Sequence, residues 1–264
     1  MDKKRFLGIY IFLLGLVFTY VHAENTVNEY DFEYSAEGFS AVSKVSGERK
    51  YYSRGNVKKK GIDISSWSGN IDWEKLKESG IEFAMIREGY GLPNPRQVDK
   101  RFHKNIKEAQ ENGIPCGVYH YSYATSVDEA IKEAEFCISN IKSYNLEYPI
   151  AFDIEDKSAE KCRGREATDM CKAFCNKLRE SGYYTTIYAN KNWMKYFLFE
   201  KELRPKYDLW YAQWKDSIGK PDYWCGMWQK ENDQKIDGVQ WSADINECYY
   251  DYSQIIRDLH LNGF

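Results

Sequence analysis

The sequence predicts an α/β fold, a single (β/α) barrel of eight strands in which the helices are missing or reduced in the second half. Two observations lead to this fold class. From Gly61 onward, apolar segments of strand length alternate with amphipathic segments of helix length, and eight strands can be counted. No glycine-rich loop follows the first strand to hold a nucleotide phosphate, which disfavours the alternative of an open doubly wound sheet.

The first half of the predicted barrel alternates regularly between strand and helix. Its four strands are expected at residues 61–67, 81–90, 114–123 and 148–156. A short helix begins near Trp73 and stops at Gly80, and Asp99 is expected to cap the next helix, which Gly113 closes. Apolar residues at helical spacing then predict two longer helices, over 130–141 and 167–178.

The second half keeps the strands but loses most of the helical pattern. Four more strands are predicted at residues 184–190, 207–214, 226–229 and 239–245. The gaps between the later strands hold little amphipathic periodicity. We therefore expect a barrel whose outer ring of helices is incomplete on this side.

Two segments precede the predicted barrel, which we place at residues 60–264. Lys3, Lys4 and Arg5 stand before an apolar run over 6–21, and Val21-His22-Ala23 has the small-residue spacing of a signal-peptidase site. Residues 1–23 are thus expected to be a signal peptide cleaved after Ala23, with an uncleaved anchor as the alternative. The protein would be secreted or associated with the cell envelope. Residues 24–59 are polar and predict a tether without a domain of its own.

Composition narrows the classes of partner. The net charge of −3 and the absence of a basic cluster argue against nucleic acid, and we expect a monomer. The chain has 22 Tyr and 8 Trp, which is more than an apolar core requires, because the polar groups of these rings need partners when buried. Flat amphipathic rings suit the faces of sugars, although core packing explains any one ring equally well.

The seven cysteines predict neither a disulfide framework nor a metal site. An odd number cannot pair completely within one chain, and Cys171 and Cys175 lie on one apolar helical stripe. We interpret the cysteines as small buried hydrophobic residues. No Cys-x-x-Cys pair is present and the four histidines are scattered, so we expect no metal and no cofactor.

Carboxylates gather where the predicted strands end. Asp153 and Glu155 lie on one face of the fourth strand, with Cα atoms about 6.6 Å apart. Asp63 lies on the first strand and Asp244 at the end of the last. Barrel closure makes the first and last strands neighbours, so four carboxylates should meet at one mouth. A helix N-cap or a calcium ligand cluster is the alternative for the fourth strand.

Aromatic residues end or line the strands between these acids. Tyr119, Tyr188, Trp210 and Trp214 are the main candidates. Cleavage of a glycosidic bond requires an acid for the leaving oxygen, a carboxylate for the developing positive charge, and flat surfaces for the sugars. The pattern therefore indicates a glycoside hydrolase.

Several motifs in order also resemble a known family, over about residues 60–250. They are Gly61-Ile62-Asp63-Ile64-Ser65, Phe83 to Gly91, Gly117-Val118-Tyr119-His120-Tyr121, Pro149 to Asp156, Ile187-Tyr188-Ala189-Asn190, Trp210 to Trp214, Trp228-Gln229 and Asp244-Ile245-Asn246. This set resembles the glycoside hydrolases of family twenty-five, the Chalaropsis-type lysozymes or N-acetylmuramidases. Glu88 and Ala243 depart from the family pattern.

The resemblance implies a role for each candidate residue. Glu155 would be the general acid and Asp153 its helper on the same strand, with Asp63 and Asp244 completing the site. Tyr119 and Tyr188 match active-site tyrosines, and the remaining candidates for substrate binding are Trp210, Trp214 and Gln229.

The implied activity is a secreted hydrolase of peptidoglycan glycan strands that cleaves the β-1,4 bond between N-acetylmuramic acid and N-acetylglucosamine. A non-catalytic glycan-binding module and a hydrolase of another amino-sugar polymer such as chitin are the alternatives. The stereochemical course is left open between retaining, inverting and substrate-assisted hydrolysis.

Overall fold

The computed structural model describes residues 29–55, 58–214 and 219–264. The predicted signal peptide over 1–23 lies outside these residues. Within the described ranges, no helix has the length and apolar character needed to cross a membrane.

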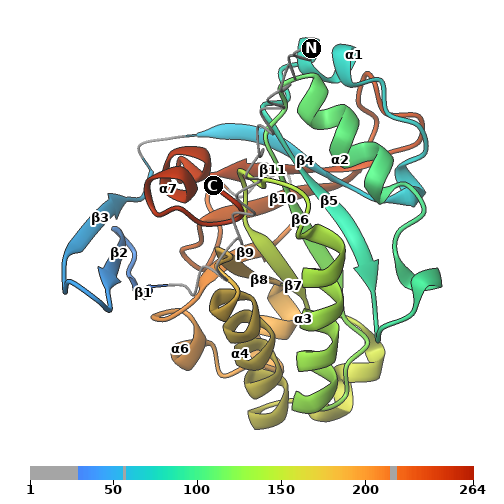
Figure 1. The fold of residues 1–264 in the computed structure, drawn as a ribbon. Helices are drawn as coiled ribbons and strands as arrows, with labels where there is room; N and C mark the ends of the chain where they lie inside the picture. The colour runs from blue at the N-terminus through green and yellow to red at the C-terminus, as the bar shows by residue number, and fades with distance from the viewer. Residues whose placement is uncertain (1–28, 56–57, 215–218) are drawn as a thin grey trace, which may run out of the picture.

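Eight strands close into a barrel, as predicted (Figure 1). They are β4 (Lys59–Ile64), β5 (Phe83–Tyr90), β6 (Cys116–Tyr121), β7 (Ile150–Asp153), β8 (Thr185–Asn190), β9 (Asp208–Ala212), β10 (Met227–Gln234) and β11 (Ala243–Cys248). The seven strands from β4 to β10 run parallel to their neighbours in this series. The carboxyl ends of these seven strands therefore meet at one mouth of the barrel.

The last strand runs in the opposite direction. β11 is antiparallel to both β10 and β4, so Asp244 lies near the beginning of its strand and not at the end, as we had predicted. The connection over 235–242 is a short hairpin, and a parallel return would need a crossover of a dozen residues or more. Because the strand is reversed, its beginning lies at the same mouth as the ends of the other strands.

Helices cover the barrel unevenly, as expected. After each of the first four barrel strands comes one α-helix, and after β8 only two short helices follow. Within the described residues no helix lies between β9 and β11. The helices are α1 (Trp73–Glu78), α2 (Phe102–Glu111), α3 (Val127–Ile141), α4 (Arg165–Glu180), α5 (Lys191–Tyr196), α6 (Glu200–Leu203) and α7 (Tyr252–Asp258), with 3-10 turns η1 (Ser66–Ser68), η2 (Pro95–Gln97) and η3 (Lys157–Cys162).

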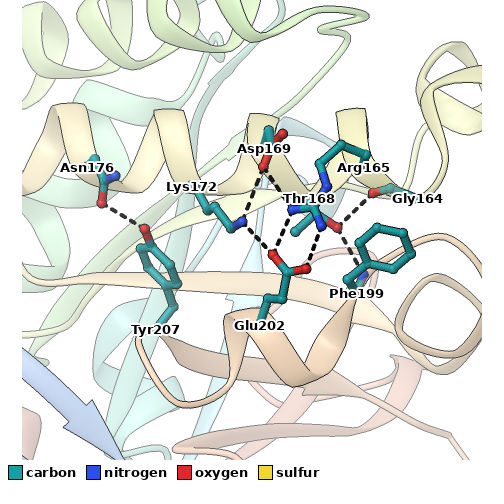
Figure 2. A network of polar contacts seen from close by, with 9 residues as sticks. All are labelled: Gly164, Arg165, Thr168, Asp169, Lys172, Asn176, Phe199, Glu202 and Tyr207. Carbon is teal, nitrogen blue, oxygen red and sulfur yellow. Dashed lines mark hydrogen bonds and ion pairs between the residues drawn. The ribbon is translucent and has the colours of Figure 1, made fainter.

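A polar network holds the four-residue helix α6 against α4 (Figure 2). Glu202 accepts hydrogen bonds from the guanidinium of Arg165 at 2.6 and 2.7 Å and from the ammonium of Lys172 at 2.8 Å. Thr168 accepts a hydrogen bond from the backbone N–H of Phe199 at 2.9 Å. A helix of this length is marginal by itself, so these contacts fix the segment that leads into β9.

Residues 30–53, which fall within the predicted polar tether over 24–59, are folded. They form a three-stranded antiparallel sheet of β1 (Tyr30–Tyr34), β2 (Gly38–Ser43) and β3 (Arg49–Ser53). Phe32 and Tyr34 on β1, and Phe39 and Ala41 on β2, are buried at a spacing of two residues. That spacing is the signature of a half-buried strand, but it is short and lies among polar residues.

The small sheet packs on the end of the barrel opposite the carboxylates. Phe39 makes an edge contact with Tyr250 at a centroid distance of 5.2 Å, and the hydroxyl of Tyr34 donates to that of Tyr184 at 3.2 Å. Tyr184 and Tyr252 donate in turn to the buried carboxyl of Asp208, the first residue of β9. Together these rings close the amino end of the barrel.

We predict that Phe39→Leu lowers the stability of the whole domain. The substitution removes ring contacts with Tyr34, Tyr52 and Tyr250 and should reduce the free energy of unfolding by about 2 kcal/mol. Urea unfolding followed by tryptophan fluorescence measures the change. Tyr51→Leu is the control, because Tyr51 lies on β3 with 57% of its surface exposed. Equal stability of the Phe39 variant and the parent would show that the sheet does not support the barrel.

All seven cysteines are free and buried. This confirms their interpretation as small hydrophobic residues. Burial also raises the pKa of the Cys175 and Cys225 thiols to about 12, so these thiols are unreactive at neutral pH.

Candidate active site

The four predicted carboxylates meet at the mouth formed by the carboxyl ends of the parallel strands. Asp153 is the last residue of β7 and Glu155 follows it by two residues. Asp63 on β4 is directly paired with Asp244 on β11 in the antiparallel register. The Asp153–Glu155 pair and the Asp63–Asp244 pair thus occupy different parts of the rim. The charge of each pair raises the pKa of carboxyls in the other.

Amide groups hold Asp63 and Asp244 in place. The Nε2 of Gln229 donates to Asp63 Oδ2 at 2.8 Å and to Asp244 Oδ2 at 3.1 Å. Asn246 donates to the same oxygen of Asp63 at 2.8 Å. Gln229 is itself fixed, because its Oε1 accepts from the hydroxyl of Tyr188 at 3.0 Å and from the indole N–H of Trp214 at 2.9 Å. The two carboxyls are therefore bridged and oriented before any substrate arrives.

Glu155 is half-buried, and its carboxyl is tuned for proton donation. Burial raises its pKa above the ordinary value, the hydrogen bond from Asn190 lowers it, and the charge of Asp244 raises it again, with a net upward shift. The Asn190 Nδ2 lies 3.2 Å from Glu155 Oε2. A carboxyl with a raised pKa stays protonated closer to neutral pH, as a general acid must.

Asp153 is more deeply buried and is incompletely hydrogen-bonded. Only 4% of its surface is exposed, and its Oδ1 has no hydrogen-bond partner among the described residues. Burial is the main cause of a pKa well above the ordinary range, and the charges of Glu155 and Asp63 add to it. A buried polar atom without a partner is costly, so this oxygen is available for a donor from a bound molecule.

The Asp63–Asp244 pair also resists full ionisation. Burial and the facing Asp244 raise the pKa of Asp63 well above its usual range, against the lowering effect of the Asn246 and Gln229 hydrogen bonds. Burial likewise raises the pKa of Asp244, while the hydrogen bond from the backbone N–H of Asp233, at 2.7 Å, lowers it. The mouth therefore carries less negative charge at neutral pH than four isolated carboxylates would.

The predicted aromatic residues play different parts. Tyr119 lines a cavity of about 180 Å³ together with Asp63 and Asp244, and Trp214 is 42% exposed. Both rings can reach a ligand. Tyr188 is 5% exposed and reaches the site only through its hydroxyl.

Two predicted substrate-binding residues are too deeply buried for that role. Trp210 has 1% of its surface exposed, and its ring packs against Tyr119 and Tyr188 at centroid distances of 5.8 and 4.7 Å. Its indole N–H donates to Asn246 at 2.7 Å. Trp210 thus supports the residue that holds Asp63, and it offers no face to a sugar. Gln229, 2% exposed, orients the carboxylates instead.

Sequence reasoning missed the roles of two polar side chains at this mouth. Asn190 bonds Glu155 and Asn246 bonds Asp63, and each comes two residues after a predicted site residue, on the same face of the strand. That spacing could have identified them.

Asp99 was expected to cap α2, but its Oδ2 accepts hydrogen bonds from the Arg87 guanidinium at 2.8 and 2.9 Å. The N-cap of α2 is Arg101.

Glu88, noted as a departure from the family pattern, is separate from the mouth. Its carboxyl is fully buried and contacts the Nδ1 of His120 at 2.9 Å. In the described part of the chain, no three His, Cys, Asp or Glu side chains are grouped so that they could hold a metal ion.

Comparison with known proteins decides the family. The sequence model described as "Glycosyl hydrolases family 25" matches residues 62–239, which is more than half of the chain. The chain belongs to this family. The resemblance inferred from the sequence motifs is thereby confirmed, and the match includes Asp63, Asp153 and Glu155.

Curated relatives of this family 25 chain are lysozymes and muramidases. It is 28% identical to the autolytic lysozyme of Clostridium acetobutylicum over 192 residues, covering 71% of this chain and 55% of that protein. It is 27% identical to lysozyme M1 of Streptomyces globisporus over 202 residues, covering 71% of this chain and 66% of that protein. The chain thus spans little more than half to about two thirds of the length of these relatives.

Solved structures show the same fold. The chain is similar to the bacterial lysozyme from Streptomyces coelicolor, with a TM-score of 0.59 and 25% identity over 73% of this chain and 93% of that one. It is also similar to the autolysin LytC from Streptococcus pneumoniae, solved in complex with a synthetic peptidoglycan ligand. For this pair the TM-score is 0.64 and the identity is 25%, and the match covers 83% of this chain and 58% of LytC.

Proposed function

We propose that this family 25 member is a muramidase, which hydrolyses the β-1,4 bond between N-acetylmuramic acid and N-acetylglucosamine in peptidoglycan. The observation that carries the proposal is the pairing of Glu155, with its raised pKa, and Asp153, whose buried Oδ1 lacks a donor. The lysozyme and muramidase names of the relatives support the choice of substrate.

In this mechanism Glu155 protonates the glycosidic oxygen as the bond to C1 breaks. Asp153 Oδ1 accepts a hydrogen bond from the N–H of the acetamido group on the N-acetylmuramic acid residue that contains C1. This hydrogen bond turns the acetamido oxygen toward C1. That oxygen forms the new bond to C1 from the face opposite the leaving group. The donated N–H also lowers the pKa of Asp153, because a hydrogen bond to the charged form favours ionisation.

The second half of the reaction returns the site to its starting state. A water molecule attacks C1 and gives its proton to the Glu155 carboxylate, while the acetamido oxygen leaves C1. The two displacements together retain the configuration at C1. Among the three courses left open by the sequence, the partnerless oxygen of Asp153 favours this substrate-assisted one.

The test is mass spectrometry of peptidoglycan digested by the purified protein. New reducing ends should be N-acetylmuramic acid, and chitin oligomers should remain intact. Reducing ends of N-acetylglucosamine, or cleavage of chitin at a comparable rate, would replace the proposal with another hydrolase. Binding of glycan strands without any cleavage would identify a glycan-binding module.

We predict that the fall of activity at high pH, the alkaline limb of the pH profile, follows the deprotonation of Glu155. Because its pKa is raised in the folded protein, activity should persist above the ordinary carboxyl range and fall as pH rises through the raised value. Asn190→Asp keeps the Oδ1 that caps α5 but replaces a donor with a second acid. It should move the alkaline limb upward by about one pH unit.

The measurement is kcat as a function of pH on soluble glycan strands. Asn192→Asp is the matched control, since Asn192 is exposed on α5 and takes part in the local hydrogen bonds through its backbone N–H, which donates to Asn190 Oδ1 at 3.0 Å. A limb that stays in place, or moves to lower pH, in Asn190→Asp would assign the alkaline limb to another group.

We also propose that the protein is exported, since its proposed substrate lies outside the cytoplasmic membrane. The predicted leader over 1–23 supports this. The intact mass of the protein recovered from culture medium should correspond to a chain that begins at Glu24. Recovery of the full-length chain with the membrane fraction would indicate the uncleaved anchor instead.

A further inference from the structure

A second and larger cavity adjoins the carboxylate mouth. It has a volume of about 930 Å³ and lies between η1, the end of β5 and the beginning of α2. Trp67, which is 80% exposed, lines both this cavity and the smaller one that contains Asp63 and Asp244. A molecule bound at the carboxylates can therefore extend into the larger cavity past Trp67.

The larger cavity is cationic, although the chain as a whole has a net charge of −3. Its lining includes four basic side chains, Arg87, Lys100, Arg101 and Lys104, and a single carboxylate, that of Asp99. A concave surface lined by one sign of charge concentrates the opposite sign. This cavity therefore attracts anions, whereas the neighbouring mouth repels them.

The one carboxylate in the lining is already neutralised. Asp99 Oδ2 accepts from Arg87 at 2.8 and 2.9 Å and from the backbone N–H of Ser66 at 3.0 Å, and Oδ1 accepts from the N–H of Arg101 at 2.9 Å. Its side chain is 1% exposed. Asp99 and Arg87 thus form a closed pair, and the surplus positive charge belongs to Lys100, Arg101 and Lys104.

These three cations have weak partners or none. Arg101 donates to the neutral amide oxygen of Asn70 at 2.6 Å, and Lys104 has only a long, exposed pair with Glu108 at 3.8 Å, a kind of contact that contributes little. In the described residues Lys100 has no ion pair or hydrogen bond. Their charge remains available to a ligand.

The position of these cations is not explained by the stability of α2. They stand before or in its first turn, where no acidic residue is present and where positive charge opposes the helix dipole. Neutralising Lys100 and Lys104 should therefore leave the fold intact. The remaining walls include the rings of Tyr90, Tyr121 and Tyr123, which can pack against an extended chain.

We infer that this cavity binds the carboxylates of the peptide stem carried by the muramic acid residue of the substrate. The inference rests on the proposed muramidase function. A stem-bearing glycan is anionic, and the negative charge that the carboxyls at the mouth retain disfavours its approach. The cations at one side of the mouth attract the carboxylates of the peptide stem. Binding of the stem there orients the glycan strand across Glu155.

The experiment compares strand binding by two charge-matched double variants in a Glu155→Gln background, which slows turnover by about 10² to 10⁴-fold. The test variant is Lys100→Gln with Lys104→Gln, and the control is Lys107→Gln with Lys132→Gln, two exposed lysines outside the cavity. Calorimetry gives Kd for phosphate-free soluble strands that carry peptide stems and for the same strands after an amidase has removed the stems.

The test variant should bind stem-bearing strands on the order of tenfold more weakly than its parent, and bind stem-free strands within about twofold of it. The control should match its parent on both, and the tenfold difference should shrink at high salt. Equal losses on both strands, or no loss on either, would overturn the inference.

A phosphate group of a wall polymer could offer the same anionic chemistry. A loss seen only with phosphate-bearing wall fragments would assign the cavity to that group and overturn the stem assignment. Failure of the muramidase proposal is distinguishable, because it would show as intact strands after incubation with the unsubstituted protein, in which Glu155 is present, independently of the Kd ratios.

Discussion

Replacing Glu155 with Gln should lower kcat on peptidoglycan by about 10² to 10⁴-fold while KM changes little. Glutamine keeps the shape and can still accept the hydrogen bond from Asn190, but it has no proton to transfer. The sugar leaving group is a poor one without protonation. The loss should therefore fall on the step in which the bond to the leaving oxygen breaks.

A second substrate tests the role of the acid directly. An aryl glycoside with a good leaving group needs little protonation, so Glu155→Gln should cleave it at a rate much closer to that of the parent protein. Glu160→Gln, an exposed residue on η3, serves as the control and should behave as the parent on both substrates. Equal losses on peptidoglycan and on the aryl glycoside would show that Glu155 is not the proton donor.

Much of the fold could be predicted because the signals are local and repeated. Each of the first four strand–helix units contains a buried apolar strand and an amphipathic helix, and the two periods differ clearly. The reversal of β11 could not be predicted in the same way. Its residues read as a strand in either direction, and only the short hairpin over 235–242, which leaves no room for a crossover, reveals the antiparallel return.

The sheet formed by β1, β2 and β3 was missed for a different reason. Its strands are only five or six residues long, and β2 does not alternate, since four consecutive residues of it are buried. The burial of this sheet depends on the rings of Tyr184 and Tyr250, far away in the sequence. The polar composition of this segment matches the exposed face of the sheet. It could not reveal that Phe39 and its neighbours cover the end of a barrel.

The carboxylates of the site were predictable, whereas the accessibility of the aromatic residues was not. Asp63, Asp153 and Glu155 stand at strand ends, where barrel geometry alone brings them together. Trp210 and Trp214 come from the same strand region, yet one is 1% and the other 42% exposed. The difference arises because Trp210 points into the barrel, where Asn246 accepts its N–H, while Trp214 lies beyond the end of β9.

Replacing Asp153 with Asn should lower kcat on peptidoglycan by about 10² to 10³-fold, the size expected when a group that stabilises developing charge is lost. The parent carboxyl has a buried oxygen without a donor, which we assign to the acetamido N–H of the substrate. An amide in its place cannot carry the negative charge that strengthens this hydrogen bond as the acetamido oxygen attacks C1.

Two substrates separate this role from that of the acid. Asp153→Asn should remain slow on the aryl glycoside with a good leaving group, because orientation of the acetamido group is still impaired. On an analogue with a hydroxyl in place of the acetamido group, the parent protein should itself be slow and the variant little slower.

Urea unfolding supplies the control for folding in this comparison. Removal of a carboxyl whose pKa is raised by burial relieves a desolvation cost at neutral pH, so Asp153→Asn should be at least as stable as the parent. If the good leaving group restores the rate of Asp153→Asn but not that of Glu155→Gln, the roles of acid and helper are reversed.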